Sequence, residues 1–115
     1  MGLGAALLLM LQAGAPGTLN FDVRCMIALG QMAETTDQET RAAASTASQY
    51  YFGRIDGRVP DGQLEAALVG ETRGMPAEPS PQLLQACGTY MAARGQRLAE
   101  VGRRMGEREG PPTRR

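Results

Sequence analysis

Two cysteines, one near each end of a chain of 115 residues, place the strongest constraint on how this sequence folds. Cys25 and Cys87 each lie among apolar residues at helical spacing. A disulfide between them would close a long loop, which in the chain-entropy model stabilises a fold by about 4 kcal/mol. Because disulfides persist outside the reducing cytosol, we predict one structural disulfide and a periplasmic or secreted protein. The alternative for the same two residues is a reactive thiol.

The amino terminus has features of an export signal. Residues 3–11 are mostly apolar, and the small residues 13–15 follow in the pattern of a signal-peptidase site. The apolar run is too short to span a bilayer. We therefore predict that residues 1–17 are a signal peptide, cut after Ala15 or after Gly17, and that the mature chain has no stable membrane insertion. The alternative is an ordinary amphiphilic helix at the terminus.

The composition favours helices over sheet. Aromatic residues make up 4% of the chain, there is no Trp, and the apolar residues are mainly Ala, Leu, Met and Val. We predict an all-α fold, a small bundle of about four helices in one domain over residues 18–109, with a disordered tail at 110–115. Twelve Arg balance twelve acidic residues, so no basic excess is present to hold a phosphate backbone. We expect no nucleic-acid partner.

Capping residues and apolar spacing place four helical segments. Ser80 followed by Pro81 is typical of a helix start, because the missing N–H of proline is unpaired there in any case. The first predicted segment has its N-cap at Asn20 and runs to Glu34, and the second begins at a capping box at 36–39 and runs to Phe52. The third has its N-cap at Asp61 and runs to Val69. The fourth begins at Ser80 and is the longest.

The last predicted helix carries an apolar seam of about seven-residue period, interrupted by Arg94. Gly88, Gly95 and Gly102 recur seven apart beside this seam, and each costs about 1 kcal/mol relative to Ala inside a helix. Close approach of a neighbouring helix would explain them, and compositional drift in a chain rich in Gly and Ala is the alternative. The seam consists of Leu84, Cys87, Met91, Leu98, Val101 and Met105.

The chain has no His, which removes the commonest general base and most zinc and haem sites. We predict a non-enzymatic protein with no cofactor and no metal. Paired carboxylates remain an alternative source of acid–base chemistry on a sugar, which would make the protein a small enzyme acting on an envelope polymer. The candidate carboxylates are Glu34, Asp37 and Glu39, or Asp56 with Asp61.

The stretch 53–62 contains three Gly and one Pro, so we expect the chain to leave the helix there and turn. Charged side chains alternate around these glycines, and charges held on a turn can dock a partner. Arg54, Asp56, Arg58 and Asp61 are therefore a candidate partner-docking turn. The alternative is a helix stop with solvated charges.

The order of these elements resembles the HdeA-like periplasmic acid-stress chaperones. A leader, a cysteine in the first mature helix, and the run from Ser80 and Pro81 to the second cysteine at Cys87 carry this resemblance. It implies an acid-activated holdase. The chain also looks like other small exported helical proteins of Gram-negative bacteria, and like the disulfide-bonded immunity proteins that block type six secretion amidases.

Two functions follow as hypotheses. The first is a protein-binding module of immunity or adaptor type, a monomer or small homo-oligomer that holds another protein through an exposed face. The second is the holdase, in which protonation of the carboxylates leaves the Arg charges uncompensated, loosens the bundle and exposes Leu and Met.

Overall fold

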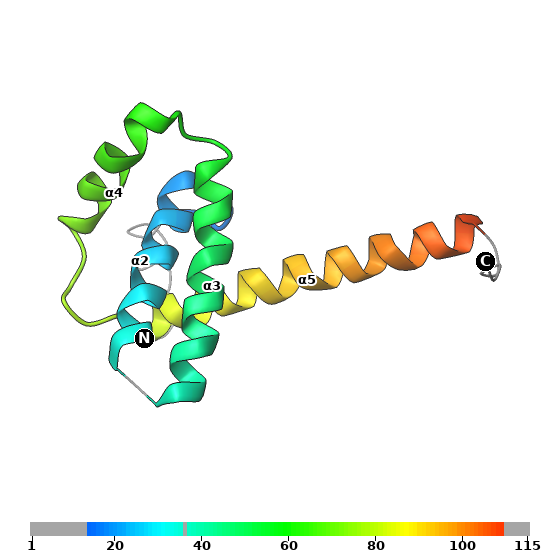
Figure 1. Ribbon diagram of the computed structural model, residues 1–115, viewed down its shortest axis with the longest axis horizontal. Helices are drawn as coiled ribbons and strands as arrows, with labels where there is room; N and C mark the ends of the chain where they lie inside the picture. Colours follow the sequence, from blue (N-terminus) through cyan, green and yellow to red (C-terminus); the bar gives the residue numbers. More distant parts are fainter. Residues whose placement is uncertain (1–13, 36, 110–115) are drawn as a thin grey trace, which may run out of the picture.

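The computed structural model describes residues 14–35 and 37–109, and within these ranges the fold is all-α, as predicted. Most of the predicted signal peptide, Thr36 of the predicted capping box and the predicted tail at 110–115 lie outside the described residues. Figure 1 shows the arrangement of the helices. They are α2 (Leu19–Thr35), α3 (Gln38–Asp56), α4 (Leu64–Thr72) and α5 (Pro81–Glu109), with a short 3-10 turn η1 (Asp61–Gln63) before α4.

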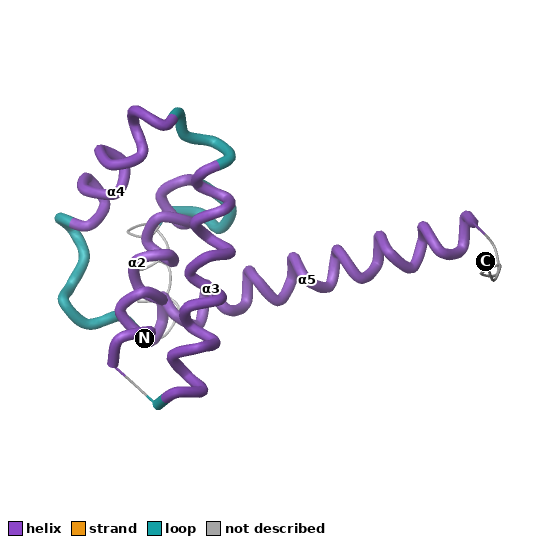
Figure 2. Tube along the Cα trace, viewed as in Figure 1, coloured by secondary structure: helices purple, strands orange, loops and turns teal. Residues whose placement is uncertain are grey.

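Helices α2 and α3 form an antiparallel pair that makes up the body of the domain, with α4 beside α2 (Figure 2). The first part of α5 packs on this pair, and the rest of the helix extends away from it (Figure 1). The core lies where α2, α3 and α5 meet, and its centre is formed by Phe21, Cys25, Tyr51 and Cys87. The predicted disulfide joins Cys25 to Cys87 at this centre, with the two Cα atoms 5.6 Å apart.

Two predicted helix starts are shifted. Helix α2 begins at Leu19, one residue before the predicted cap Asn20, and the Oγ1 atom of Thr18 accepts a hydrogen bond from the backbone N–H of Phe21 at 3.3 Å. Both Thr and Asn are good caps, so the sequence offers two starts and packing selects one. The predicted N-cap Asp61 lies instead in η1, and α4 begins three residues later at Leu64.

The other two starts are close to prediction. Asp37 caps α3, because its carboxylate accepts from the backbone N–H of Thr40 at 3.0 Å. Ser80 accepts from the N–H of Leu83 at 3.3 Å, and Pro81 is the first residue of α5. With 29 residues, α5 is the longest helix described, as expected.

The predicted break at Gly53 is wrong, because α3 continues to Asp56. A glycine costs about 1 kcal/mol inside a helix. The next turn offsets this cost, since Ile55 is fully buried and Arg54 forms an ion pair with Asp22 on α2. The chain leaves the helix at Gly57 instead, one turn later than expected.

Candidate functional site

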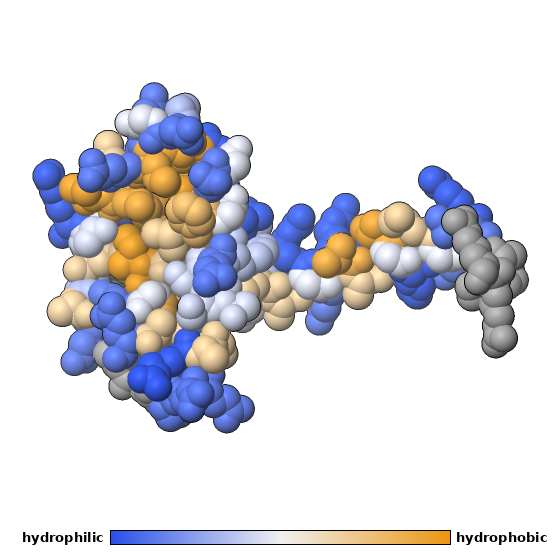
Figure 3. Space-filling model, in the orientation of Figure 1, coloured by the Kyte–Doolittle hydropathy of each residue, from blue (hydrophilic) through white to orange (hydrophobic). Residues whose placement is uncertain are grey.

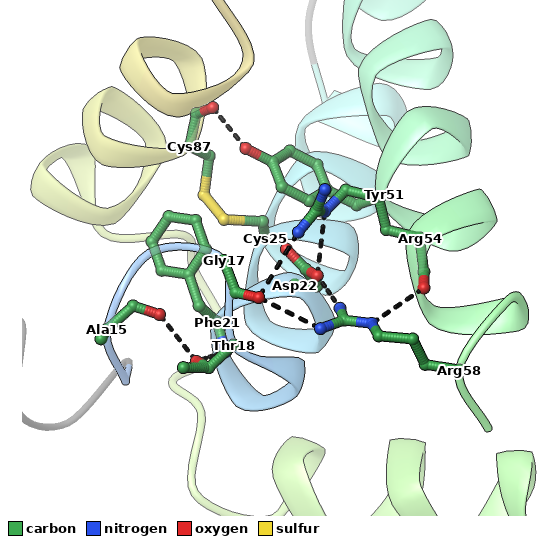
Figure 4. A network of polar contacts seen from close by, with 10 residues as sticks. All are labelled: Ala15, Gly17, Thr18, Phe21, Asp22, Cys25, Tyr51, Arg54, Arg58 and Cys87. Atoms are coloured by element: carbon green, nitrogen blue, oxygen red, sulfur yellow. Dashed lines mark hydrogen bonds and ion pairs between the residues drawn. A yellow bond between two sulfur atoms is a disulfide. The ribbon is translucent and has the colours of Figure 1, made fainter. Parts of the chain in front are cut away.

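The disulfide lies in an aromatic and polar cluster that joins three helices (Figure 4). The buried hydroxyl of Tyr51 on α3 donates a hydrogen bond to the carbonyl oxygen of Cys87 on α5. Phe21 packs edge-on against both Tyr51 and Tyr90, with ring centroids 6.3 and 5.7 Å apart. Burial, and then the neighbouring Tyr50 and Tyr90, raise the pKa of the Tyr51 hydroxyl above its ordinary value, so it remains a neutral donor.

Two residues of the predicted docking turn point back into the domain. Asp22 on α2 is fully buried, and its Oδ2 atom forms ion pairs with Arg54 at 3.0 Å and with Arg58. The Arg54 guanidinium also lies over the Tyr90 ring, 5.0 Å from its centroid. The Nε of Arg58 donates to the carbonyl of Arg54 at 3.1 Å. These two arginines therefore tie α3 to α2 (Figure 4), and Arg54 also contacts α5 through Tyr90.

The other two residues of that turn lie apart from this cluster. Asp56 and Asp61 are both exposed, and neither takes part in an ion pair within the described ranges. The structure thus brings together Arg54 and Arg58 but leaves Asp56 and Asp61 facing solvent. Arg58 is also exposed but is paired with Asp22, so the charges of this turn that have no counter-charge within the described residues are negative.

Gly17 holds the start of the described chain against the same cluster. Its carbonyl oxygen accepts from Arg58 at 3.1 Å and from Arg54 at 3.4 Å. Its φ of 89° lies in the left-handed region, and an added Cβ would stand 3.2 Å from the Tyr90 hydroxyl. Both the backbone conformation and the close approach require glycine here.

The part of α5 from Arg94 to Glu109, here called the arm, extends beyond the body with an exposed apolar face. Leu98 is 74% exposed, Met105 58% and Val101 39%. In the space-filling view, apolar side chains gather on the outer half of this helix (Figure 3). A residue and its neighbours three and seven positions later share one helix face, so these three side chains form one stripe.

The arm is a poor helix by itself. Gly95, Gly102 and Gly106 together cost about 3 kcal/mol relative to Ala. The ion pairs that stabilise the helix offset little of this cost, since Glu100 with Arg104 and Arg103 with Glu107 are exposed and supply about 0.3 to 0.5 kcal/mol each. A segment of this length is marginal as an isolated helix in water. A contact along the arm would supply the stability that its sequence lacks.

An apolar groove of about 310 Å³ lies at the base of the arm, between α2, α3 and α5. Its α3 wall consists mainly of the small side chains of three alanines, and its α5 wall includes Cys87 of the disulfide. Thr40 supplies the hydroxyl in an otherwise apolar lining. The lining consists of Leu29, Met32, Thr40, Ala43, Ala44, Ala47, Leu84, Cys87, Gly88 and Met91.

The predicted acid–base carboxylates do not line this groove. Glu34, Asp37 and Glu39 are all exposed and lie around the turn between α2 and α3, near the end of the groove at Thr40. The pKa of Asp37 is lowered by hydrogen bonds from the backbone and the side chain of Thr40, as expected of a helix cap. These residues form an acidic rim beside an apolar groove.

The described residues contain no group of three or more Cys, Asp or Glu able to hold a metal ion. None of the helices in the described ranges is long and apolar enough to cross a membrane. Comparisons with protein-family models, with curated proteins and with solved structures give no match to this chain. The HdeA-like resemblance and the candidate functions therefore stay predictions.

Proposed function

We propose that this protein is a non-enzymatic binding module, of immunity or adaptor type, that acts through protein–protein contact and uses the arm of α5 as its docking element. The observation that supports this most is the exposure of Leu98, Val101 and Met105 on one face of a helix that leaves the body. An amphipathic helix commonly binds by laying such a face into an apolar groove of its partner.

The test compares capture by three forms of the tagged, oxidised protein at neutral pH. Leu98→Glu places a charge at the centre of the apolar face, and Gln96→Glu places the same charge two residues earlier, on the opposite side of α5. We expect the wild type and Gln96→Glu to hold one protein stoichiometrically, and Leu98→Glu to lose it. An identical set of bound proteins for all three forms contradicts the proposal.

Export to the periplasm or beyond the cell is part of this proposal, and the buried disulfide supports it. A cut after Ala15 keeps Gly17, whose carbonyl oxygen binds Arg54 and Arg58, whereas a cut after Gly17 removes that acceptor. We therefore favour the cut after Ala15. The intact mass of the protein recovered from the envelope distinguishes the two sites, and a mass that retains residue 1 with two free thiols contradicts export.

A second candidate function, the acid-activated holdase, is favoured by the position of Asp22. This buried carboxylate accepts both ion pairs that link α2 to Arg54 and Arg58, and the other acceptors that face these cations, the carbonyl oxygens of Gly17 and Arg54, carry no charge. Protonation of Asp22 would leave two cations side by side without a counter-charge. The body would then loosen and expose its apolar residues.

The holdase is tested by protection of an aggregating client protein at acid pH. Asp22→Asn mimics the protonated carboxyl, so we expect this variant to unfold and to protect clients at a higher pH than the wild type does. Asp56→Asn, at an exposed carboxyl at the end of α3, is the matched control and is expected to behave like the wild type. A wild-type chain that stays compact and inert in acid rules out this function.

A further inference from the structure

We infer that the arm of α5 docks on α5 and the groove of a second copy of this chain, so that two copies form an antiparallel, two-fold symmetric dimer. This inference rests on the proposed function, since it names the protein that the arm contacts. One apolar face of α5 is continuous from the groove to the arm. Leu84 and Met91 line the groove, and Leu98 and Met105 continue the same seven-residue spacing into the exposed stripe of the arm.

An antiparallel pair of α5 helices that cross at Leu98 makes this face self-complementary. Leu98 of one copy then lies against Leu98 of the other, and Met105 of each copy lies against Met91 of the other. The free end of each arm therefore reaches the groove of the opposite copy. An interface that uses the same patch on both copies closes on itself, so it stops at two copies and does not form a filament.

The groove suits a flexible apolar side chain such as Met105. Its volume is about 310 Å³, and its α3 wall, Ala43, Ala44 and Ala47, has no long side chains to fill that space from within one copy. A thioether side chain has three rotatable bonds and adapts to irregular apolar cavities.

The glycines of α5 supply an independent observation. A Cβ atom added to Gly95, Gly102 or Gly106 would meet no atom within 4 Å, so packing within the described chain does not require glycine at these positions. All three lie on one face of α5, beside the apolar stripe, because they are spaced seven and four residues apart. The distance between two packed helices depends on the side chains at the contact, and glycine allows the closest approach. A second α5 would use the space that one copy leaves open.

Charge complementarity favours a second copy over a different protein. The arm carries five Arg and three Glu, whereas residues 14–93 carry five Arg and nine Asp or Glu. Glu34, Asp37 and Glu39 form the acidic rim at one end of the groove. The antiparallel arrangement brings each basic arm to the acidic body of the other copy. A parallel arrangement would place the like-charged arms side by side over their whole length, whereas the antiparallel crossing at Leu98 pairs them over residues 94–102 alone. Like charges in contact are unfavourable.

The oligomeric state of the oxidised full chain tests this inference. Sedimentation velocity over a concentration series is expected to show a species of twice the chain mass of 12.2 kDa. Leu98→Glu is expected to raise the dimer dissociation constant by roughly a hundredfold or more, because each dimer would bury two unpaired charges at its centre. Gln96→Glu is the matched control and is expected to leave the constant unchanged.

Gly102→Leu separates close packing from helix propensity. In an arm that packs on nothing, leucine raises the helix content and has no other effect. In the proposed dimer it blocks the approach of the second α5, so the chain becomes monomeric while circular dichroism shows equal or higher helicity. A Gly102→Leu dimer of unchanged stability overturns the inference.

Crosslinking tests the antiparallel register. The native cysteines are bonded to each other, so a bismaleimide reacts only with an introduced thiol. A mixture of Met91→Cys and Met105→Cys chains is expected to crosslink far more than either variant alone, whereas a parallel pair would crosslink each variant with itself.

Any one of four results overturns the dimer: a wild-type chain that is monomeric at every attainable concentration, a dimer that Leu98→Glu leaves intact, a Gly102→Leu dimer of unchanged stability, or crosslinks of the parallel pattern. The same experiments test the proposed function independently of the dimer. A monomeric wild type that still captures another protein, lost in Leu98→Glu, refutes the dimer and supports the binding module. A dimer that Leu98→Glu leaves intact, together with an unchanged set of captured proteins, refutes both.

Discussion

The hydroxyl of Tyr51 on α3 donates its hydrogen bond to the carbonyl oxygen of Cys87 on α5, beside the disulfide that joins α5 to α2. All three helices therefore meet at one fully buried point. Tyr51→Phe removes the donor without leaving a cavity, and we expect it to lower the free energy of unfolding by about 1 kcal/mol. Urea denaturation measures the change. Tyr50→Phe, at a half-buried residue, is the control and should change stability less.

Alkaline pH should weaken the fold through the same residue. Burial raises the pKa of Tyr51 in the folded state, whereas in the unfolded chain it titrates near 10.0. Above that pH the unfolded state binds fewer protons than the folded state, so stability falls as the pH rises. The contribution is fully present below about pH 10. Denaturation midpoints across this range should decline in the wild type and decline less in Tyr51→Phe, and equal slopes would contradict the assignment.

Reduction of the disulfide should destabilise the protein strongly. The bond joins residues separated by 62 positions, and in the chain-entropy model a loop of that length contributes about 4 kcal/mol. We expect the reduced protein, and a Cys25→Ala, Cys87→Ala variant, to lose about 2 to 4 kcal/mol of stability. Thermal unfolding with and without reductant measures it, and the double variant, which should not respond to reductant, is the control.

Much of the fold could be predicted from local signals. The start of α5 followed from Ser80 and Pro81, which are adjacent in sequence. The pairing of Cys25 with Cys87 followed because the chain has two cysteines, each on the apolar face of a predicted helix. The predicted stop at Gly53 failed because it rested on the glycines and the proline of residues 53–62 and took no account of packing. The burial of Ile55, which keeps α3 helical, depends on contacts that a local pattern does not contain.

The site was less predictable for the same reason. Arg54 and Arg58 were predicted, with Asp56 and Asp61, as a docking turn. Their partner Asp22 lies 32 and 36 positions away and is chosen by the way α3 packs on α2. The groove also needs the crossing of α5 over the alanines of α3, which no spacing reveals. By contrast, the apolar seam and the recurring glycines were visible in the sequence, and the structure shows that one copy leaves the outer part of that seam uncovered.

Acid pH should act on α3 through its cap. Hydrogen bonds from Thr40 lower the pKa of Asp37 below its ordinary 3.8, so the stabilising effect of this carboxylate is present above that pH and is lost as the pH falls through the folded-state value. Asp37→Ala should lower the unfolding temperature at neutral pH. Asp37→Asn keeps a capping oxygen without the titration, and should retain most of the stability while its acid dependence weakens. Equal melting of the alanine and asparagine variants would contradict this role.

The buried ion pairs of Asp22 should contribute more to the free energy of unfolding than the exposed ion pairs of the described residues do. Arg54 should contribute more than Arg58. Asp22 is completely buried, while the Arg54 side chain is 24% exposed and that of Arg58 is 38% exposed. Removal of one partner of a fully buried pair costs about 3 to 5 kcal/mol, and the partial exposure of both cations lets water replace part of the lost contact. We therefore expect Asp22→Asn to cost about 2 kcal/mol.

Arg54→Ala should cost more than Arg58→Ala, because Arg54 also lies over the Tyr90 ring. Urea denaturation of the three variants beside Asp56→Asn measures these differences, and a loss for Asp56→Asn as large as that for Asp22→Asn would show that the ion pairs with Asp22 do not hold α3 to α2.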